Sequence, residues 1–187
     1  KGNARQVKAA AARIAQAERP VVYAGGGVIS SGASAGAAAL AELMRIPIVT
    51  TLMGKGGVPA SHPLNLGQVG MHGSKFANLA LTESDLIIAC GARFSDRVTG
   101  RLDEFAPHAD VIHIDIDPAE IGKVREVQVP IVGDLKGVLS ALCAQLEKDG
   151  AQPRTEAWLA TIDEWRRRYP FYRPGIDEAP AGIVPEA

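Results

Sequence analysis

Short apolar runs alternate with segments of helical periodicity along most of the chain. Residues 3–18 place apolar side chains at helical spacing, which predicts an opening helix that ends before Pro20. Residues 21–24 form an apolar run followed by three glycines, the pattern of a buried strand that enters a tight turn. The alternation continues, with strands predicted at residues 47–50, 85–90, 111–115 and 129–132, and helices at residues 33–45, after Ser74 and after Asp134.

This alternation predicts an α/β fold: an open parallel sheet of about five or six strands with helices on both faces, of the Rossmann-like type. Pro130 cannot donate to a strand ladder, so we expect the last strand to lie at an edge. Residues 54–73 hold six glycines and two prolines without any period, and we interpret them as one long loop.

The pattern changes after residue 148. Residues 149–153 are typical of a linker, and the helix that follows carries Trp158, Ile162, Trp165 and Tyr169 in register. Residues 170–187 contain four prolines and no period, which indicates an extended connector. We therefore divide the chain into one domain at residues 1–148 and a linker, helix and connector at residues 149–187.

Composition excludes several classes of function. Apolar residues make up 47% of the 187 positions and charged residues 22%, with a net charge of −1, so nothing indicates a nucleic-acid partner. No apolar run approaches the roughly 20 residues of a membrane span, and we expect a cytoplasmic protein. Cys90 and Cys143 are predicted to be buried free thiols, and no metal-ligand spacing occurs. The chain opens at Lys1 rather than Met, which leaves its natural N-terminus undetermined.

Candidate ligand chemistry follows the predicted strands, because open parallel sheets bind ligands beyond the carboxyl ends of their strands. Glycines let a phosphate approach the backbone, carboxylates suit ribose hydroxyls, and Arg93 and Arg97 could pair with a pyrophosphate. Together they favour a nucleotide ligand. The residues that follow the strands are Gly25, Gly26, Gly27, Thr51, Leu52, Met53, Gly91, Ala92, Arg93, Asp115, Ile116, Asp117, Gly133 and Asp134.

Each of these signals also has a structural explanation. The three glycines could form only a tight turn, Asp134 could be a helix cap, and His72 could be a loop histidine without function. His113 alternates with apolar neighbours and is interpreted as a sheet histidine with its hydrogen bonds satisfied. The G-x-G-x-x-G fingerprint fails at Ser30, no acid follows the second strand, and no Walker loop is present, so an NAD-dependent hydride-transfer enzyme is poorly supported.

Six sequence strings resemble, in order, the central domain of the acetolactate (acetohydroxyacid) synthase family, whose members depend on thiamin diphosphate. The resemblance covers Gly2 to about Tyr172. One departure is Ser95, where members often carry an acid, which leaves the hydrogen bonding around Arg97 open. The strings are residues 19–27, 50–56, 70–73, 91–100, 113–118 and 130–134.

The resemblance implies a three-domain parent enzyme that condenses two pyruvates, or pyruvate and 2-ketobutyrate, in branched-chain amino-acid biosynthesis. It implies FAD on this domain without a net redox step, and thiamin diphosphate with Mg²⁺ in missing pyrimidine- and pyrophosphate-binding domains. It also implies a homodimer or tetramer, with a possible regulatory small subunit. The implied flavin contacts are Gly25, Gly26, Gly27, Thr51, Leu52, Met53, Met71, His72, Gly73, Gly91, Ala92, Arg93, Arg97 and Val98, with Asp115, Ile116, Gly133 and Asp134 at the adenosine end.

In the family, Asp96 and Arg97 border the substrate channel of the full enzyme. The activating glutamate belongs to another domain, and the Gly-Asp…Asn magnesium motif of thiamin enzymes is absent here. We therefore expect no catalytic residue in this chain and no turnover by it alone, while its affinity for FAD stays open. Two alternatives remain: the middle domain of a sister enzyme, such as glyoxylate carboligase or a 2-ketoacid decarboxylase, and a free-standing nucleotide-binding module.

Overall fold

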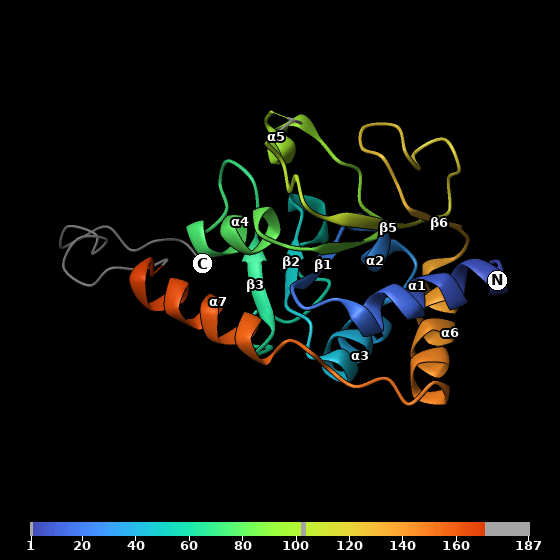
Figure 1. Ribbon diagram of the computed structural model, residues 1–187. Coiled ribbons are helices and arrows are strands. Elements are labelled where there is room, and N and C mark those ends of the chain that lie inside the picture. Colours follow the sequence, from blue (N-terminus) through green and yellow to red (C-terminus); the bar gives the residue numbers. More distant parts are fainter. Residues whose placement is uncertain (1, 102–103, 171–187) are drawn as a thin grey trace.

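A six-stranded, all-parallel sheet forms the centre of the protein, with helices on both faces (Figure 1). The computed structural model describes residues 2–101 and 104–170. The strand order is β3-β2-β1-β4-β5-β6, so the direction of winding reverses between β1 and β4. This confirms the predicted α/β class. The strands are β1 (Pro20–Ala24), β2 (Ile48–Thr50), β3 (Asn65–Gln68), β4 (Leu86–Cys90), β5 (Asp110–Asp115) and β6 (Val129–Val132).

Continuous apolar sequence in the strands has a direct structural reason. Every residue of β1 and β4 is buried, because parallel strands covered on both faces need apolar side chains at each position. Successive side chains point to opposite faces. Val22 and Ile88 therefore belong to one core, and Val21 and Ile87 to the other.

The helices form the two outer layers. α1, α3 and α6 contribute to the core that contains Val22, while α4 and α7 contribute to the core that contains Val21. Figure 1 shows α1, α3 and α6 grouped on one side of the sheet, with α4 and α7 beyond β3. The helices are α1 (Ala4–Gln16), α2 (Gly26–Ser30), α3 (Ser34–Met44), α4 (Lys75–Thr82), α5 (Asp96–Thr99), α6 (Leu135–Lys148) and α7 (Glu156–Arg168), with a 3-10 turn η1 (Leu52–Gly54).

Side-chain caps begin two of the predicted helices. The Ser74 hydroxyl accepts a hydrogen bond from the Ala77 amide at 3.2 Å, and the Asp134 carboxylate accepts one from the Gly137 amide at 2.9 Å. Each bond satisfies a backbone N–H of the first helical turn, which has no carbonyl partner within the helix. The predicted cap roles of Ser74 and Asp134 are confirmed.

One edge strand of the sheet was predicted from the sequence, and the other was not. β6 lies at one edge, where Pro130 is tolerated, as expected. The interpretation of residues 54–73 as one loop is wrong, because β3 forms the other edge and pairs Asn65 with Ile48. The sequence Asn-Leu-Gly-Gln lacks the β-branched and aromatic residues that signal a strand. Its pairing depends on backbone groups that β2 leaves open.

Helix α7 packs on the sheet. Trp158 is buried, and its indole N–H donates to the Pro20 carbonyl at 3.2 Å. Ile162 is also buried in this core, and the Thr155 hydroxyl donates to the Arg45 carbonyl at 2.9 Å. The division proposed after residue 148 stays a prediction. Residues 171–187 of the predicted connector lie outside the described residues.

An aromatic cluster lies beneath the centre of the sheet. The Phe94 ring lies 5.6 Å from that of Tyr23 and 5.5 Å from that of His113, measured between centroids. The Tyr23 hydroxyl and both His113 nitrogens are buried and lack a hydrogen-bond partner among the described residues. The interpretation of His113 as hydrogen-bonded is therefore wrong: neither nitrogen meets a partner in the described part of the chain, and the edge of one ring packs on the other in the contact with Phe94. Burial lowers the pKa of His113, against the opposing effect of the Asp115 carboxylate.

The cysteines are free, as predicted. Cys90 is fully buried, and burial raises the pKa of its thiol to about 12. The predicted burial of Cys143 is wrong, because its side chain packs against the core but remains only partly buried. In the described part of the chain, no helix has both the length and the apolar character needed to cross a bilayer.

Candidate nucleotide site at the carboxyl edge of the sheet

Backbone hydrogen bonds join the segments that follow the strands into one continuous edge. The first residues after β1, β2, β4 and β6 each donate to the end of a neighbouring strand, so segments distant in sequence lie side by side. We call this edge, residues 25–27, 51–53, 70–73, 91–98, 115–116 and 133–134, the rim. The bonds are Thr51 to the Ala24 carbonyl, Gly25 to Cys90, Gly91 to Ile114, and Gly133 to Asp115, all at 2.9 Å.

The centre of the rim is a close contact between two backbones at the point where strand order reverses. The Gly27 amide donates to the Gly91 carbonyl at 3.0 Å, and Gly91 has a φ of 54°. A β-carbon on Gly27 would lie 2.6 Å from the Gly91 α-carbon. Close packing thus explains this glycine without any ligand, and the predicted turn is followed at once by the short helix α2. Gly26 instead faces the Met53 β-carbon.

The turn η1 presents apolar side chains outward. The Thr51 hydroxyl accepts a hydrogen bond from the Gly54 amide at 3.0 Å and so closes the turn. Leu52 and Met53, which lie between these two residues, project into solvent. Their exposure follows from the geometry of the turn, because the bond between Thr51 and Gly54 fixes the backbone that carries them.

The most exposed large apolar side chains of the described chain all lie on the rim. Exposed at one edge of the sheet, they are available for contact with a ligand. All four were among the predicted site residues. They are Leu52, Met53, Met71 and Ile116, each between 65% and 77% exposed.

The loop from Gly70 to Gly73 is attached to the segment that follows β4. The Met71 amide donates to the Arg97 carbonyl at 3.3 Å. Gly70 has a φ of 95°, and a β-carbon on it would lie 2.8 Å from that same carbonyl. The structure therefore places Met71 beside Arg97 and Val98, a contact that the sequence did not predict.

Two arginines are available for an anion. The Arg93 and Arg97 side chains are exposed, and neither makes an ion pair or a side-chain hydrogen bond within the described residues. The Asp96 carboxylate accepts the Arg97 amide at 2.9 Å and the Ser95 hydroxyl at 3.2 Å. Ser95, which stands where family members often carry an acid, thus donates a hydrogen bond to the carboxylate that accepts the Arg97 amide.

The acids at the other end of the rim have local backbone partners. The Asp115 carboxylate accepts the Asp117 amide at 2.9 Å. Asp134 caps α6 through one oxygen. A carboxylate has two oxygens that accept about four hydrogen bonds in all, so both acids keep capacity for ribose hydroxyls.

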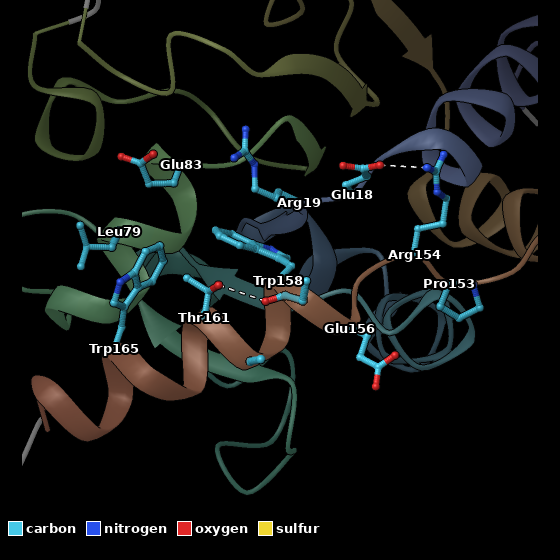
Figure 2. A pocket seen from close by; sticks show the side chains of 12 residues that line it. Glu18, Arg19, Leu79, Glu83, Pro153, Arg154, Glu156, Trp158, Thr161 and Trp165 are labelled. Carbon is cyan, nitrogen blue, oxygen red and sulfur yellow. Dashed lines mark hydrogen bonds and ion pairs between the residues drawn. The ribbon is translucent and has the colours of Figure 1, made fainter.

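A hollow on the described surface lies away from the rim. It has a volume of about 940 Å³ and is formed by α7, the end of α4 and the residues before β1. Figure 2 shows Trp158 and Trp165 of α7 with Leu79, and the 2.8 Å ion pair of Glu18 with Arg154. None of the predicted site residues lines this hollow, which lies at the amino end of β1.

Comparison with known proteins gives the family. Residues 7–142 match the family model described as "Thiamine pyrophosphate enzyme, central domain", which covers most of the chain and every strand of the sheet. The chain belongs to this family. The rim of this central domain falls entirely within the matched residues.

Individual relatives agree. The central domain is 57% identical over 166 residues to a probable acetolactate synthase large subunit of Methanocaldococcus jannaschii, covering 89% of the chain and 28% of that protein. It is 50% identical over 173 residues to the acetolactate synthase large subunit of Parasynechococcus marenigrum, covering 92% and 28%. It is 52% identical over 180 residues to an acetolactate synthase of Mycobacterium avium, covering 95% and 29%. The chain thus spans less than a third of the length of these relatives.

Sequence reasoning missed one polar residue that shapes the rim of this central domain. Asn78 of α4 accepts a hydrogen bond from the Gly70 amide at 2.8 Å and donates one to the Gly70 carbonyl at 3.1 Å. The only sequence signal was an amide side chain one turn after the Ser74 cap. That signal does not identify its partner.

Proposed function

We propose that this domain binds FAD at the rim and belongs to an acetolactate synthase. The observation that carries the proposal is the rim itself, where exposed Met53 and Met71 share one edge of the sheet with Arg93 and Arg97, whose side chains have no ion-pair partner among the described residues. Such edges of doubly wound sheets are where dinucleotides bind. The relatives named acetolactate synthase support the enzyme assignment.

The residues present suit the parts of FAD. Exposed Leu52, Met53 and Met71 offer apolar contact for a flat isoalloxazine ring. Arg93 and Arg97 offer charge for a pyrophosphate. On the other side of the reversal, Asp115 at the end of β5 and Asp134 after β6 offer acceptors for the adenosine ribose, and the exposed Ile116 follows Asp115.

This domain binds and orients the cofactor but supplies no catalytic group. FAD in such an enzyme contributes no net oxidation or reduction, so the rim residues act on its position. We propose that the parent enzyme is cytoplasmic and joins two pyruvates, or pyruvate and 2-ketobutyrate. Its pyrimidine- and pyrophosphate-binding domains would hold thiamin diphosphate and Mg²⁺, in a homodimer or tetramer with a possible regulatory subunit.

A titration of FAD into the chain, followed by quenching of flavin fluorescence, tests the proposal. We expect saturable binding that Arg93→Ala weakens by about tenfold, the value of one charge-assisted hydrogen bond. Arg19→Ala is the matched control, because Arg19 is also exposed but lies at the amino end of β1. Absence of binding, or equal loss in both variants, would contradict a flavin site at the rim.

Two further measurements test the enzyme assignment. We expect no acetolactate from pyruvate with this chain alone, because none of its residues is assigned to catalysis. Turnover by the isolated chain would contradict the absence of catalytic residues from this domain. ADP that binds as tightly as FAD would instead favour the central domain of a sister thiamin enzyme.

A further inference from the structure

The Asn78 side chain holds the backbone of Gly70 from both sides. Its amide oxygen accepts from the Gly70 N–H at 2.8 Å, and its amide nitrogen donates to the Gly70 carbonyl at 3.1 Å. Its own backbone is set by the first turn of α4, where the Asn78 N–H donates to the Ser74 carbonyl at 3.1 Å. Asn78 thus joins a capped helix to the loop that carries Met71 and His72.

Gly70 is the point at which this loop turns toward the segment after β4. Its carbonyl also accepts the Gly73 amide at 2.9 Å, so it receives two donors. The next residue, Met71, donates to the Arg97 carbonyl. One amide side chain therefore helps to fix the Met71 loop where it meets the Arg97 turn.

We propose that Asn78 is a positioning residue for the flavin half of the ligand, acting through Gly70 without touching the ligand. This inference rests on the proposed function. An asparagine suits the task because its amide both donates and accepts, whereas an ionised aspartate only accepts and alanine does neither. Correct placement of Met71 before binding removes the cost of ordering it when the ligand arrives.

The position of the loop in the sheet makes the effect specific to one half of the ligand. The loop follows β3, which is one edge strand, whereas Asp115 ends β5 and Asp134 follows β6, the other edge strand. A shift of the loop therefore alters Met71 and leaves these acids in place. Affinity for the flavin half should depend on Asn78, and affinity for the adenosine half should not.

The experiment compares Asn78→Ala, Asn78→Asp and Asn65→Ala in the full chain, with FAD, FMN and ADP as separate probes. Asn65 is a matched control, because its partly buried amide also accepts a backbone N–H, from Gly67, and donates to the carbonyls of Val58 and Pro59. Asn65 lies at the start of β3, away from the rim. Thermal unfolding and amide hydrogen exchange are measured on the same samples.

We expect Asn78→Ala to weaken FAD and FMN by about tenfold, from the loss of two hydrogen bonds, with ADP unchanged. Asn78→Asp should fall between Asn78→Ala and the original chain, because it retains only the bond from the Gly70 amide. The Met71 amide should exchange faster in Asn78→Ala, while amides of β4 keep their rates. Asn65→Ala should change neither FAD affinity nor Met71 exchange.

Equal weakening of FAD and ADP, or unchanged FAD affinity in Asn78→Ala, would overturn the inference. Failure of the original chain to bind FAD would contradict the proposed function instead. In that case Met71 exchange still decides whether Asn78 positions the loop. Unchanged exchange in Asn78→Ala would then reject the role of Asn78 as well.

Discussion

The backbones of Gly27 and Gly91 are in close contact at the point where the strand order reverses, and the contact leaves no room for a side chain on Gly27. The Gly91 α-carbon lies 2.6 Å from the place of a β-carbon on Gly27, and the Gly27 amide donates to the Gly91 carbonyl. The turn after β1 and the end of β4 can approach only because both residues lack side chains. This contact brings the two central segments of the rim together.

Gly27→Ala is expected to lower the free energy of unfolding by about 1–3 kcal/mol, because the new methyl group must displace the Gly91 backbone. Urea denaturation measures the change. Gly137→Ala in α6 is the control, because its nearest contact, the Asp134 carboxylate, would lie at an ordinary 3.6 Å. That control should be stabilised, since alanine favours helix over glycine. Equal stability of Gly27→Ala and the original chain would contradict the close contact.

Asp134 can be tested for its two proposed roles separately. Asp134→Ala should cost about 1 kcal/mol of stability by removing the cap of α6. Asp134→Ser retains a capping oxygen but removes the charge, so its stability should remain close to that of the original chain. If Asp134 also holds the ribose, Asp134→Ser should still weaken FAD binding in the fluorescence titration. Unchanged affinity would limit Asp134 to the cap.

Trp158 links α7 to the sheet through its indole N–H and the Pro20 carbonyl. Trp158→Phe should lower the free energy of unfolding by about 1–3 kcal/mol, because it leaves this carbonyl without its side-chain donor in a buried place. Trp165→Phe is the control, since Trp165 is only partly buried. Guanidinium denaturation followed by circular dichroism compares the two. A larger loss in Trp165→Phe would argue against docking of α7 through Trp158.

His113 should make stability depend on pH in the acidic range. Burial lowers its pKa in the folded chain, more than the Asp115 and Glu120 carboxylates raise it. As the pH falls below about 6.5, the ordinary pKa of histidine, His113 therefore becomes protonated in the unfolded chain before it does so in the folded chain. The free energy of unfolding should fall with decreasing pH by up to about 1.4 kcal/mol per unit, until the folded chain is protonated too.

Thermal denaturation between about pH 7 and pH 5 tests this dependence. His113→Phe should give a flatter slope, because phenylalanine does not titrate. His72→Gln, at an exposed position, should retain the original slope. An identical slope in His113→Phe would show that other groups cause the loss of stability in acid.

Local sequence determined the elements and their type. The continuous apolar runs of β1 and β4 and the apolar stripe of α6 must be buried in any fold, so these predicted elements appear in the structure. Caps at Ser74 and Asp134 were equally readable, because a cap involves residues three positions apart. Pro130 located β6 at an edge for a similarly local reason, the missing N–H.

The tertiary structure alone decided which residues meet. β3 was missed because its pairing depends on the open edge of β2, and His113 was misjudged because its neighbours come from Phe94 and other distant segments. The contact of Gly27 with Gly91 and the hold of Asn78 on Gly70 likewise join residues whose partners no local pattern identifies. The period of apolar residues indicates which face of an element is buried. Which residues of different elements contact one another depends on the order of the strands in the whole sheet.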